Sequence, residues 1–149
     1  MISSVLIIAF SVVLLGYWFR YTCLLILKTK TSKDYSAAVV QANNLTFPQA
    51  HEKLLQENRF KELDALHQSL ARDYQLLTYL LEHTAGFQAG GFPVEQRMLA
   101  LDFKLMQCCY ALTRRFSAAP ARRALDEMSQ ILSHFANAMG ERAAAASRA

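Results

Sequence analysis

Histidine and cysteine are the residue types in this chain that could bind a metal ion or a haem iron. A di-metal carboxylate centre in a helical bundle needs a glutamate three residues before a histidine on facing helices, and no glutamate here has that spacing. The C-x-x-C-H motif of covalently attached haem is absent from the sequence as well. A bis-histidine haem stays open as an alternative, but we expect surface or half-buried histidines and no cofactor or metal. The four histidines are His51, His67, His83 and His134.

The adjacent residues Cys108 and Cys109 are a second candidate, as a redox or metal-binding pair. Two neighbouring cysteines within a helix cannot easily bridge each other. Cys108 also falls on an apolar stripe of its predicted helix, where cysteine acts as a small core residue. We therefore expect Cys108 to pack in the core. The third cysteine, Cys23, lies in or near a predicted membrane segment, so the set fits a reducing cytoplasmic compartment.

Two aspartates, Asp73 and Asp102, lie beside apolar stripes. Burial raises the pKa of a carboxyl group and can turn it into a general acid or base. Pairing with a neighbouring cation is the favoured interpretation, and Arg72, Arg97 and Lys104 are the candidates. Because no set of catalytic side chains is assembled by the sequence pattern, we expect a non-enzymatic protein.

A segment with three glycines, residues 85–92, joins two predicted helices. It fits no phosphate-binding fingerprint, which would need a lysine and a preceding strand. Two interpretations stay open. The segment is either a flexible connector or the tip of a partner-binding surface that uses Phe87 and Phe92.

Four arginines are packed into ten residues between two predicted helices. Near an anionic membrane surface each basic residue contributes about 1 kcal/mol of binding free energy. The cluster therefore predicts contact with anionic lipid or with a partner, and its alternative is a solvated cluster that pairs with Asp126 and Glu127. The cluster consists of Arg114, Arg115, Arg122 and Arg123.

These side chains follow an N-terminal segment, Met1 to Lys28, that carries no charge over its first 19 residues. About 20 apolar residues in a helix span a bilayer core, so the segment predicts a single-pass transmembrane anchor. A cleaved signal peptide is the main alternative, but no basic residue precedes the apolar run and no A-x-A pattern follows it.

The charged and aromatic flank of this segment predicts its orientation. Tyrosine and tryptophan favour the headgroup region, and basic residues favour the cytoplasmic side. All charge lies on the C-terminal side, so we expect the N-terminus outside and the C-terminal domain in the cytoplasm. The predicted membrane-interface residues are Tyr17, Trp18, Arg20, Tyr21, Lys28, Lys30 and Lys33.

The net charge of +4 is concentrated in two places, at the membrane flank and in the arginine cluster. Each place holds four of the 16 basic residues, so the other eight face 12 acidic residues. A nucleic-acid-binding protein would carry a broader basic face. We therefore expect the lipid bilayer and a protein as partners, and no nucleic acid.

The remaining chain has no alternating strand pattern and predicts an all-α fold. Prolines at 48, 93 and 120 begin helices, and heptad stripes run through residues 60–84, 93–116 and 118–140. We expect an antiparallel bundle of three long helices plus one or two short ones. The predicted organisation is an anchor at 1–28, a linker with a short helix at 29–45, the bundle at 46–140 and a tail at 141–149.

The predicted helix over residues 93–116 is apolar on two sides. We assign its main stripe to the core, and the second side makes the helix either central in the bundle or covered by a partner on its outer face. The main stripe is Val94, Met98, Leu101, Leu105, Cys108 and Leu112, and the second side is Leu99, Phe103, Met106 and Tyr110.

Residues 47–70 (FPQAHEKLLQENRFKELDALHQSL) resemble one tetratricopeptide-type helix–turn–helix at generic positions. One such unit does not establish a repeat array, and a single bent helix over 46–84 is the alternative. We expect an accessory or scaffold subunit of a membrane complex. The alternatives are a membrane-tethered adaptor that captures a soluble partner through the tetratricopeptide-like surface, and an enzyme or cofactor carrier.

Overall fold

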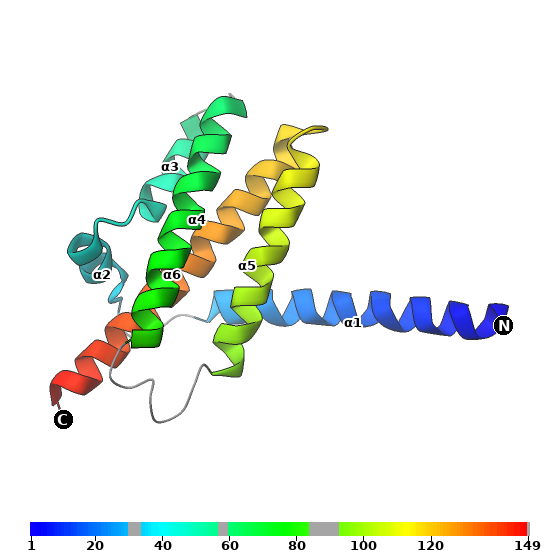
Figure 1. Ribbon diagram of the computed structural model, residues 1–149, viewed down its shortest axis with the longest axis horizontal. Helices are drawn as coiled ribbons and strands as arrows, with labels where there is room; N and C mark the ends of the chain where they lie inside the picture. The colour runs from blue at the N-terminus through cyan, green and yellow to red at the C-terminus, as the bar shows by residue number, and fades with distance from the viewer. Residues whose placement is uncertain (30–33, 57–59, 84–92, 149) are drawn as a thin grey trace. The chain divides into compact units, whose positions relative to one another are not determined.

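The computed structural model describes residues 1–29, 34–56, 60–83 and 93–148, and all the regular structure in these ranges is helical. The chain divides into two compact units, Met1–Lys30 and Thr31–Ala149. The first unit contains α1, and the second contains the bundle of α2 to α6 (Figure 1). The all-α prediction is confirmed. The helices are α1 (Ile2–Lys28), α2 (Ser36–Asn43), α3 (Phe47–Gln56), α4 (Phe60–His83), α5 (Val94–Thr113) and α6 (Ala118–Arg148).

The first unit is one apolar helix, α1, of 27 residues. It is long and apolar enough to cross a membrane, and none of its most apolar 18-residue window is buried. A helix rises about 1.5 Å per residue, so its length exceeds the thickness of a bilayer core. The tyrosines and the tryptophan predicted for an interface, Tyr17, Trp18 and Tyr21, are all exposed on it.

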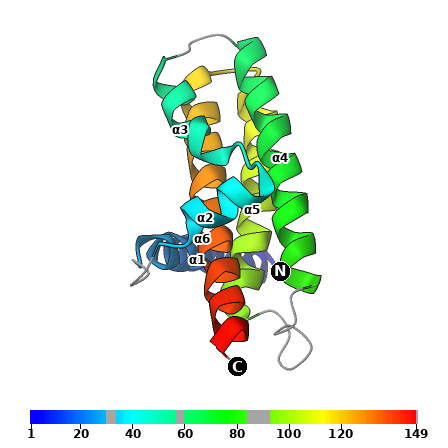
Figure 2. The same ribbon diagram turned by 90° about the vertical axis from the view of Figure 1, so that its left-hand side faces the viewer.

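The second unit is organised around its last helix, α6. This helix packs against α2, α3, α4 and α5, with α2 and α3 on one side of it (Figure 2). Small residues allow that close packing because they let neighbouring backbones approach, and Ala121, Ala124, Ala136 and Gly140 are all buried. The predicted apolar stripe of this helix is buried from Leu125 to Phe135. The helix also continues to Arg148, so the tail predicted at 141–149 is helical through that residue.

Aromatic rings join the three long helices at the centre of the core. The ring of Tyr74 on α4 stacks on that of Phe103 on α5, with 4.1 Å between centroids and 7° between planes. The same tyrosine ring lies 6.1 Å from the ring of Phe135 on α6. Stacked and tilted aromatic pairs contribute about 0.5–1.5 kcal/mol beyond the area they bury. The predicted apolar stripe of α4, from Leu63 to Leu81, is buried around them.

The helix α3 is held in place by a side chain from α4. The Oδ2 atom of Asp73 accepts hydrogen bonds from the backbone N–H groups of Thr46 (2.7 Å) and Phe47 (2.8 Å) and from the Thr46 hydroxyl (3.0 Å). The first N–H groups of a helix have no partner within the helix, and this buried carboxylate supplies one. Asp73, predicted to pair with a neighbouring cation, therefore caps the N-terminus of α3.

The short helix α2 is held in the same way by α6. The Oδ1 atom of Asn137 accepts hydrogen bonds from the backbone N–H groups of Tyr35 (2.9 Å) and Ser36 (2.8 Å). Tyr35 lies directly against Gly140, where the Cβ atom of any larger residue would overlap the tyrosine Cβ. At its other end α2 stops at Asn44, which has a φ of 50° in the left-handed region that asparagine tolerates.

The interval 46–84 holds two helices, α3 and α4, that pack against each other, rather than one bent helix. On α5, however, the prediction of the buried face was wrong. The residues of α5 that are buried are Gln96, Leu99, Asp102, Phe103, Met106 and Tyr110.

Candidate functional site

The outer surface of α5 carries an exposed row of apolar side chains, which we call the outer stripe. Its residues are those assigned to the core from the sequence, and four of them are exposed, from Leu105 at 40 % to Val94 at 71 %. Met98 is half-buried and Cys108 is exposed. A soluble surface normally scatters such residues singly, so we take this row on one helix as the candidate interaction surface. The outer stripe is Val94, Met98, Leu101, Leu105, Cys108 and Leu112.

The spacing within the outer stripe is that of a coiled-coil seam. Successive members are four, three, four, three and four residues apart, which keeps them on one face of the helix. At 100° per residue this face lies nearly opposite the buried face that includes Leu99, Phe103 and Tyr110. One face of α5 therefore belongs to the core of the bundle, and the other has the pattern that packs against a second helix.

The edges of the outer stripe carry different charges. Arg97 and Lys104, one heptad apart, are exposed along one edge, and Glu95 and Cys109 are exposed along the other. In paired helices the positions beside the seam set the choice and direction of the partner through charge pairs. The outer stripe therefore has one basic edge, formed by Arg97 and Lys104.

The polar residue Gln96 helps to explain why the faces were assigned wrongly. Its side chain is buried, and its Oε1 atom accepts a hydrogen bond of 3.1 Å from Nη2 of Arg142 on α6. The buried face also includes Asp102, which is 0 % exposed. Two polar residues on this face made it read as the less apolar side of the helix. The partner of Gln96 lies on another helix, so it is not visible in the spacing.

Both cysteines of the adjacent pair are exposed free thiols, so the prediction that Cys108 packs in the core was wrong. Their side chains point away from the bundle core because they share the outer half of α5. Within the described residues, no group of three or more histidine, cysteine, aspartate or glutamate side chains could hold a metal ion.

Of the arginine cluster, Arg114 is engaged with α4. Its Nη1 atom donates to Oδ1 of Asp64 at 2.8 Å, and the same oxygen accepts a hydrogen bond of 2.7 Å from the Tyr110 hydroxyl. Burial and this hydrogen bond to a carboxylate raise the pKa of Tyr110 far above its ordinary value of 10. The phenol stays protonated, and the arrangement fastens the end of α5 to the start of α4.

A histidine is stacked on the same tyrosine. The ring of His67 lies 4.6 Å from the ring of Tyr110 with an interplanar angle of 12°. Burial lowers the pKa of His67 below 6.5, and the charge of Asp64 opposes that shift. The imidazole is therefore mainly neutral at pH 7. The neutral imidazole of His67 can accept a proton, but Asp64 already accepts two hydrogen bonds. We therefore interpret this group of side chains as a structural contact between α4 and α5.

The other three arginines of the cluster lie around the α5–α6 turn. Arg115 and Arg123 are exposed, and Arg122 is half-buried. The turn itself is closed by hydrogen bonds of 2.9 Å from the N–H groups of Phe116 and Ser117 to the carbonyl oxygen of Thr113. The structure thus keeps at least two of the predicted cations in solvent.

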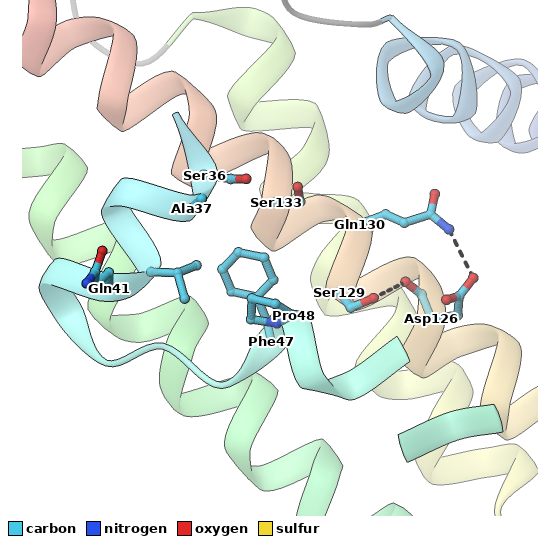
Figure 3. Close-up of a pocket in the computed structure, with 10 residues that line it drawn as sticks. Ser36, Ala37, Gln41, Phe47, Pro48, Asp126, Ser129, Gln130 and Ser133 are labelled. Atoms are coloured by element: carbon cyan, nitrogen blue, oxygen red, sulfur yellow. Dashed lines mark hydrogen bonds between the residues drawn. The ribbon is translucent and has the colours of Figure 1, made fainter. Parts of the chain in front are cut away.

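A pocket of about 520 Å³ opens between α2, α3 and α6 (Figure 3). The ring of Phe47 projects into the space between α2 and α6, and serines line its border. Asp126 supplies a carboxylate at one edge, where its Oδ2 accepts a hydrogen bond of 3.0 Å from Gln130. The lining offers neither a cation nor a nucleophile paired with a base, so this pocket supports no catalytic assignment. The lining residues are Ser36, Ala37, Val40, Gln41, Phe47, Pro48, Asp126, Ser129, Gln130 and Ser133.

Several predicted contact residues lie outside the described residues. These are Lys30 and Lys33 of the membrane flank and Phe87 and Phe92 of the glycine-containing segment. Lys28 is described, as the last residue of α1.

The comparisons with known proteins assign no family to the chain. No protein-family model, no curated protein and no solved structure matches it at a significant level. The tetratricopeptide-type resemblance of residues 47–70 therefore gains no support beyond the packed pair of helices.

Proposed function

We propose that this chain is a membrane-anchored, non-enzymatic scaffold subunit that binds a helix of a partner protein along the outer stripe of α5. The observation that carries the proposal is the double character of that helix. Leu99, Phe103 and Tyr110 are buried on one face, while Leu101 and Leu112 are exposed on the other at heptad spacing. An apolar seam of this kind costs free energy while it faces water, and a partner helix removes that cost.

The anchoring role rests on α1. The helix is apolar along its length, and the aromatic residues Tyr17, Trp18 and Tyr21 precede Lys28 at its C-terminal end. That order is typical of a span whose C-terminal side faces the cytoplasm. We therefore propose a single-pass topology with the bundle in the cytoplasm.

Burial of the outer stripe against a partner would contribute favourable free energy to binding. Complete burial of a large aliphatic side chain contributes about 1.5–3 kcal/mol. Val94, Leu101, Leu105 and Leu112 are all exposed, so together they offer several kcal/mol before the cost of association is subtracted. A partner held to the same membrane would meet this surface at a raised effective concentration, which favours another subunit of a membrane complex.

The basic edge argues against an antiparallel pair of identical α5 helices. In an antiparallel pair of identical helices, Arg97 and Lys104 would face the same two residues of the second copy. Like charges in such positions are destabilising. A partner helix with acidic residues beside an apolar seam would instead form ion pairs at the rim, where each is worth up to about 1 kcal/mol.

The alternative is a membrane-tethered adaptor for a soluble partner. The observation that favours this alternative is the packing of α3 against α4. A partner found in the soluble fraction, and bound at α3 or α4 instead of α5, would favour it.

The test is purification of the tagged full-length protein in mild detergent, with a photo-cross-linking residue at Leu105. We expect a stoichiometric integral-membrane partner whose cross-link maps to an apolar helical seam with acidic edges. The double substitution Leu101→Glu and Leu105→Glu should release the partner without changing the helix content. The matched control is Tyr79→Glu, which places a charge at an equally exposed apolar site on α4 (58 % exposed).

Three results would contradict the proposal. The first is a chain that purifies alone as a monomer. The second is a partner that stays bound to the variant with both glutamates, and the third is a cross-link from residue 105 to a second copy of the chain. Circular dichroism of each variant separates loss of binding from loss of folding.

A further inference from the structure

The turn between α5 and α6 combines the most exposed apolar side chain of the described bundle with a group of arginines. Phe116 is 87 % exposed, more than any other large apolar residue described after α1. From Leu112 through Arg123 the chain has four arginines and no acidic residue. An exposed aromatic ring costs free energy in water, and the described part of the bundle leaves this ring almost uncovered.

We propose that this turn is a second membrane contact, which inserts Phe116 among the headgroups of an anionic phospholipid bilayer and binds their phosphates through Arg115 and Arg123. The inference rests on the proposed anchoring of α1, which keeps the bundle beside the bilayer. It goes beyond that proposal because it assigns a lipid ligand and a surface to the bundle itself.

The turn holds these side chains in a defined geometry. The N–H groups of Phe116 and Ser117 both donate to the carbonyl oxygen of Thr113 at 2.9 Å. The ion pair of Arg114 with Asp64, at 2.8 Å, fixes the end of α5 against α4. The phenylalanine is therefore presented on an ordered turn, which lowers the entropy that binding would remove.

The chemistry of the group matches a lipid interface. Aromatic side chains favour the headgroup level of a bilayer. Arginine binds phosphate oxygens with two parallel N–H donors, and each basic residue near an anionic leaflet strengthens binding by roughly fivefold. Arg115 and Arg123 are both exposed, and Arg114, although paired, has a side chain that is 45 % exposed.

A protein partner is the competing class of ligand for this turn, and lipid is favoured for two reasons. Beyond Leu112, the last residue of the outer stripe, the turn carries one exposed ring among arginines, and this combination matches an anionic headgroup layer. The proposed attachment of α1 also keeps the bundle close to a bilayer, which raises the occupancy of a weak lipid contact.

The test places the single tryptophan of the chain at the turn. The full chain carrying Trp18→Phe and Phe116→Trp is reconstituted into phosphatidylcholine vesicles with and without phosphatidylserine. Emission and quenching by brominated lipid then report the depth of residue 116. We expect blue-shifted, quenched emission in the vesicles with phosphatidylserine, and a smaller effect in phosphatidylcholine alone. The control is Trp18→Phe with Tyr79→Trp, which reports an exposed site on α4.

Charge removal completes the test. The added substitutions Arg115→Gln and Arg123→Gln should lower the apparent affinity of the turn for phosphatidylserine by about 25-fold. High salt should also reduce the phosphatidylserine-dependent shift. Solvent-like emission at residue 116 in vesicles that retain the chain would overturn this inference and leave the anchoring intact. A chain that does not float with the vesicles at all would overturn both. An emission shift that is unchanged by the two arginine substitutions, or that also occurs with tryptophan at residue 79, would overturn the lipid assignment.

Discussion

Removal of the Asp73 carboxylate should detach α3 from α4 and destabilise the bundle. One oxygen of this residue accepts three hydrogen bonds, from the N–H groups of Thr46 and Phe47 and from the Thr46 hydroxyl, at 2.7, 2.8 and 3.0 Å. Asp73 is 5 % exposed. The substitution Asp73→Ala leaves these donors without their acceptor, and the N–H group of Phe47 is buried.

The size of the loss follows from that geometry. Loss of a helix cap costs about 0.5–2 kcal/mol, and a buried donor left without a partner costs about 1–3 kcal/mol. Because the donors share one acceptor, these terms overlap, and we expect a decrease of about 2–4 kcal/mol in the free energy of unfolding. Asp73→Asn retains an acceptor oxygen but loses the charge that favours a helix N-terminus, so about 1 kcal/mol is expected.

Urea unfolding of the full chain in a non-ionic detergent, followed by circular dichroism, measures the effect. With a slope of about 2 kcal/mol per M, Asp73→Ala should lower the midpoint by about 1–2 M. The exposed carboxylate of Glu82 on the same helix supplies the control, because Glu82→Ala should change stability by less than about 0.5 kcal/mol. Hydrogen exchange at the N–H groups of Thr46 and Phe47 would detect a loss confined to α3.

The reasoning fails if Asp73→Ala unfolds within about 0.5 kcal/mol of the unsubstituted chain and the amides of α3 keep their protection. It also fails if the alanine and asparagine variants are equally stable. In either case the three short distances would not represent hydrogen bonds that matter in solution.

Three further predictions concern the packing of the bundle, all measured as shifts of the urea midpoint. Gly140→Ala should destabilise the bundle by about 1–3 kcal/mol, because the new methyl group would overlap Tyr35. Without this contact, alanine in place of a helical glycine would raise stability, so an increase in stability would refute the contact. Leu99→Ala should cost about 2–5 kcal/mol and Leu101→Ala less than about 0.5 kcal/mol; equal losses would mean that α5 is turned differently. Burial lowers the pKa values of His67 and His134 below 6.5, so the unfolded chain takes up protons first and stability should fall as the pH drops below about 6.5. The double variant with glutamine at both histidines should flatten that dependence, and an unchanged pH profile would contradict the assignment.

The helices themselves could be predicted from the sequence because apolar spacing reports them directly. The stripes of α4 and α6, with Leu70 and Leu132 at 0 % exposure, are buried as expected. The α5 helix was predicted at the right place in the chain, but the wrong face of it was assigned to the core. Both of its faces are apolar, and the choice between them depends on the rings of Tyr74 and Phe135, which lie far away in the sequence.

The contacts that hold the short helices could not be predicted at all. Asp73 and Asn137 each cap a helix that lies more than 25 residues away in the chain. A helix start can be read from the sequence where a proline stands in the first turn, and Pro48 placed the start of α3 correctly. A cap from another helix depends on how the helices pack, and single-sequence spacing carries no signal of it.

The candidate surface was visible in the sequence as a second apolar side on one helix. The core side and the exposed side were exchanged, because the heptad row from Val94 to Leu112 was the more regular one and was assigned to the core. The arginine cluster was also visible. What the sequence did not indicate was the exposure of Phe116 beside those arginines, since one phenylalanine between two helices gives no pattern.

The central place of α6 has a consequence for how the protein is made. Chains leave the ribosome from the N-terminus, and domains generally fold as units during synthesis. Here α2, α3, α4 and α5 all pack on α6, which follows them in the chain, so the apolar faces that α6 covers stay uncovered until residue 118 and beyond are synthesised. A premature stop codon or frameshift within α6 would therefore remove the fold of the whole bundle, while α1, a separate unit, would still be synthesised intact.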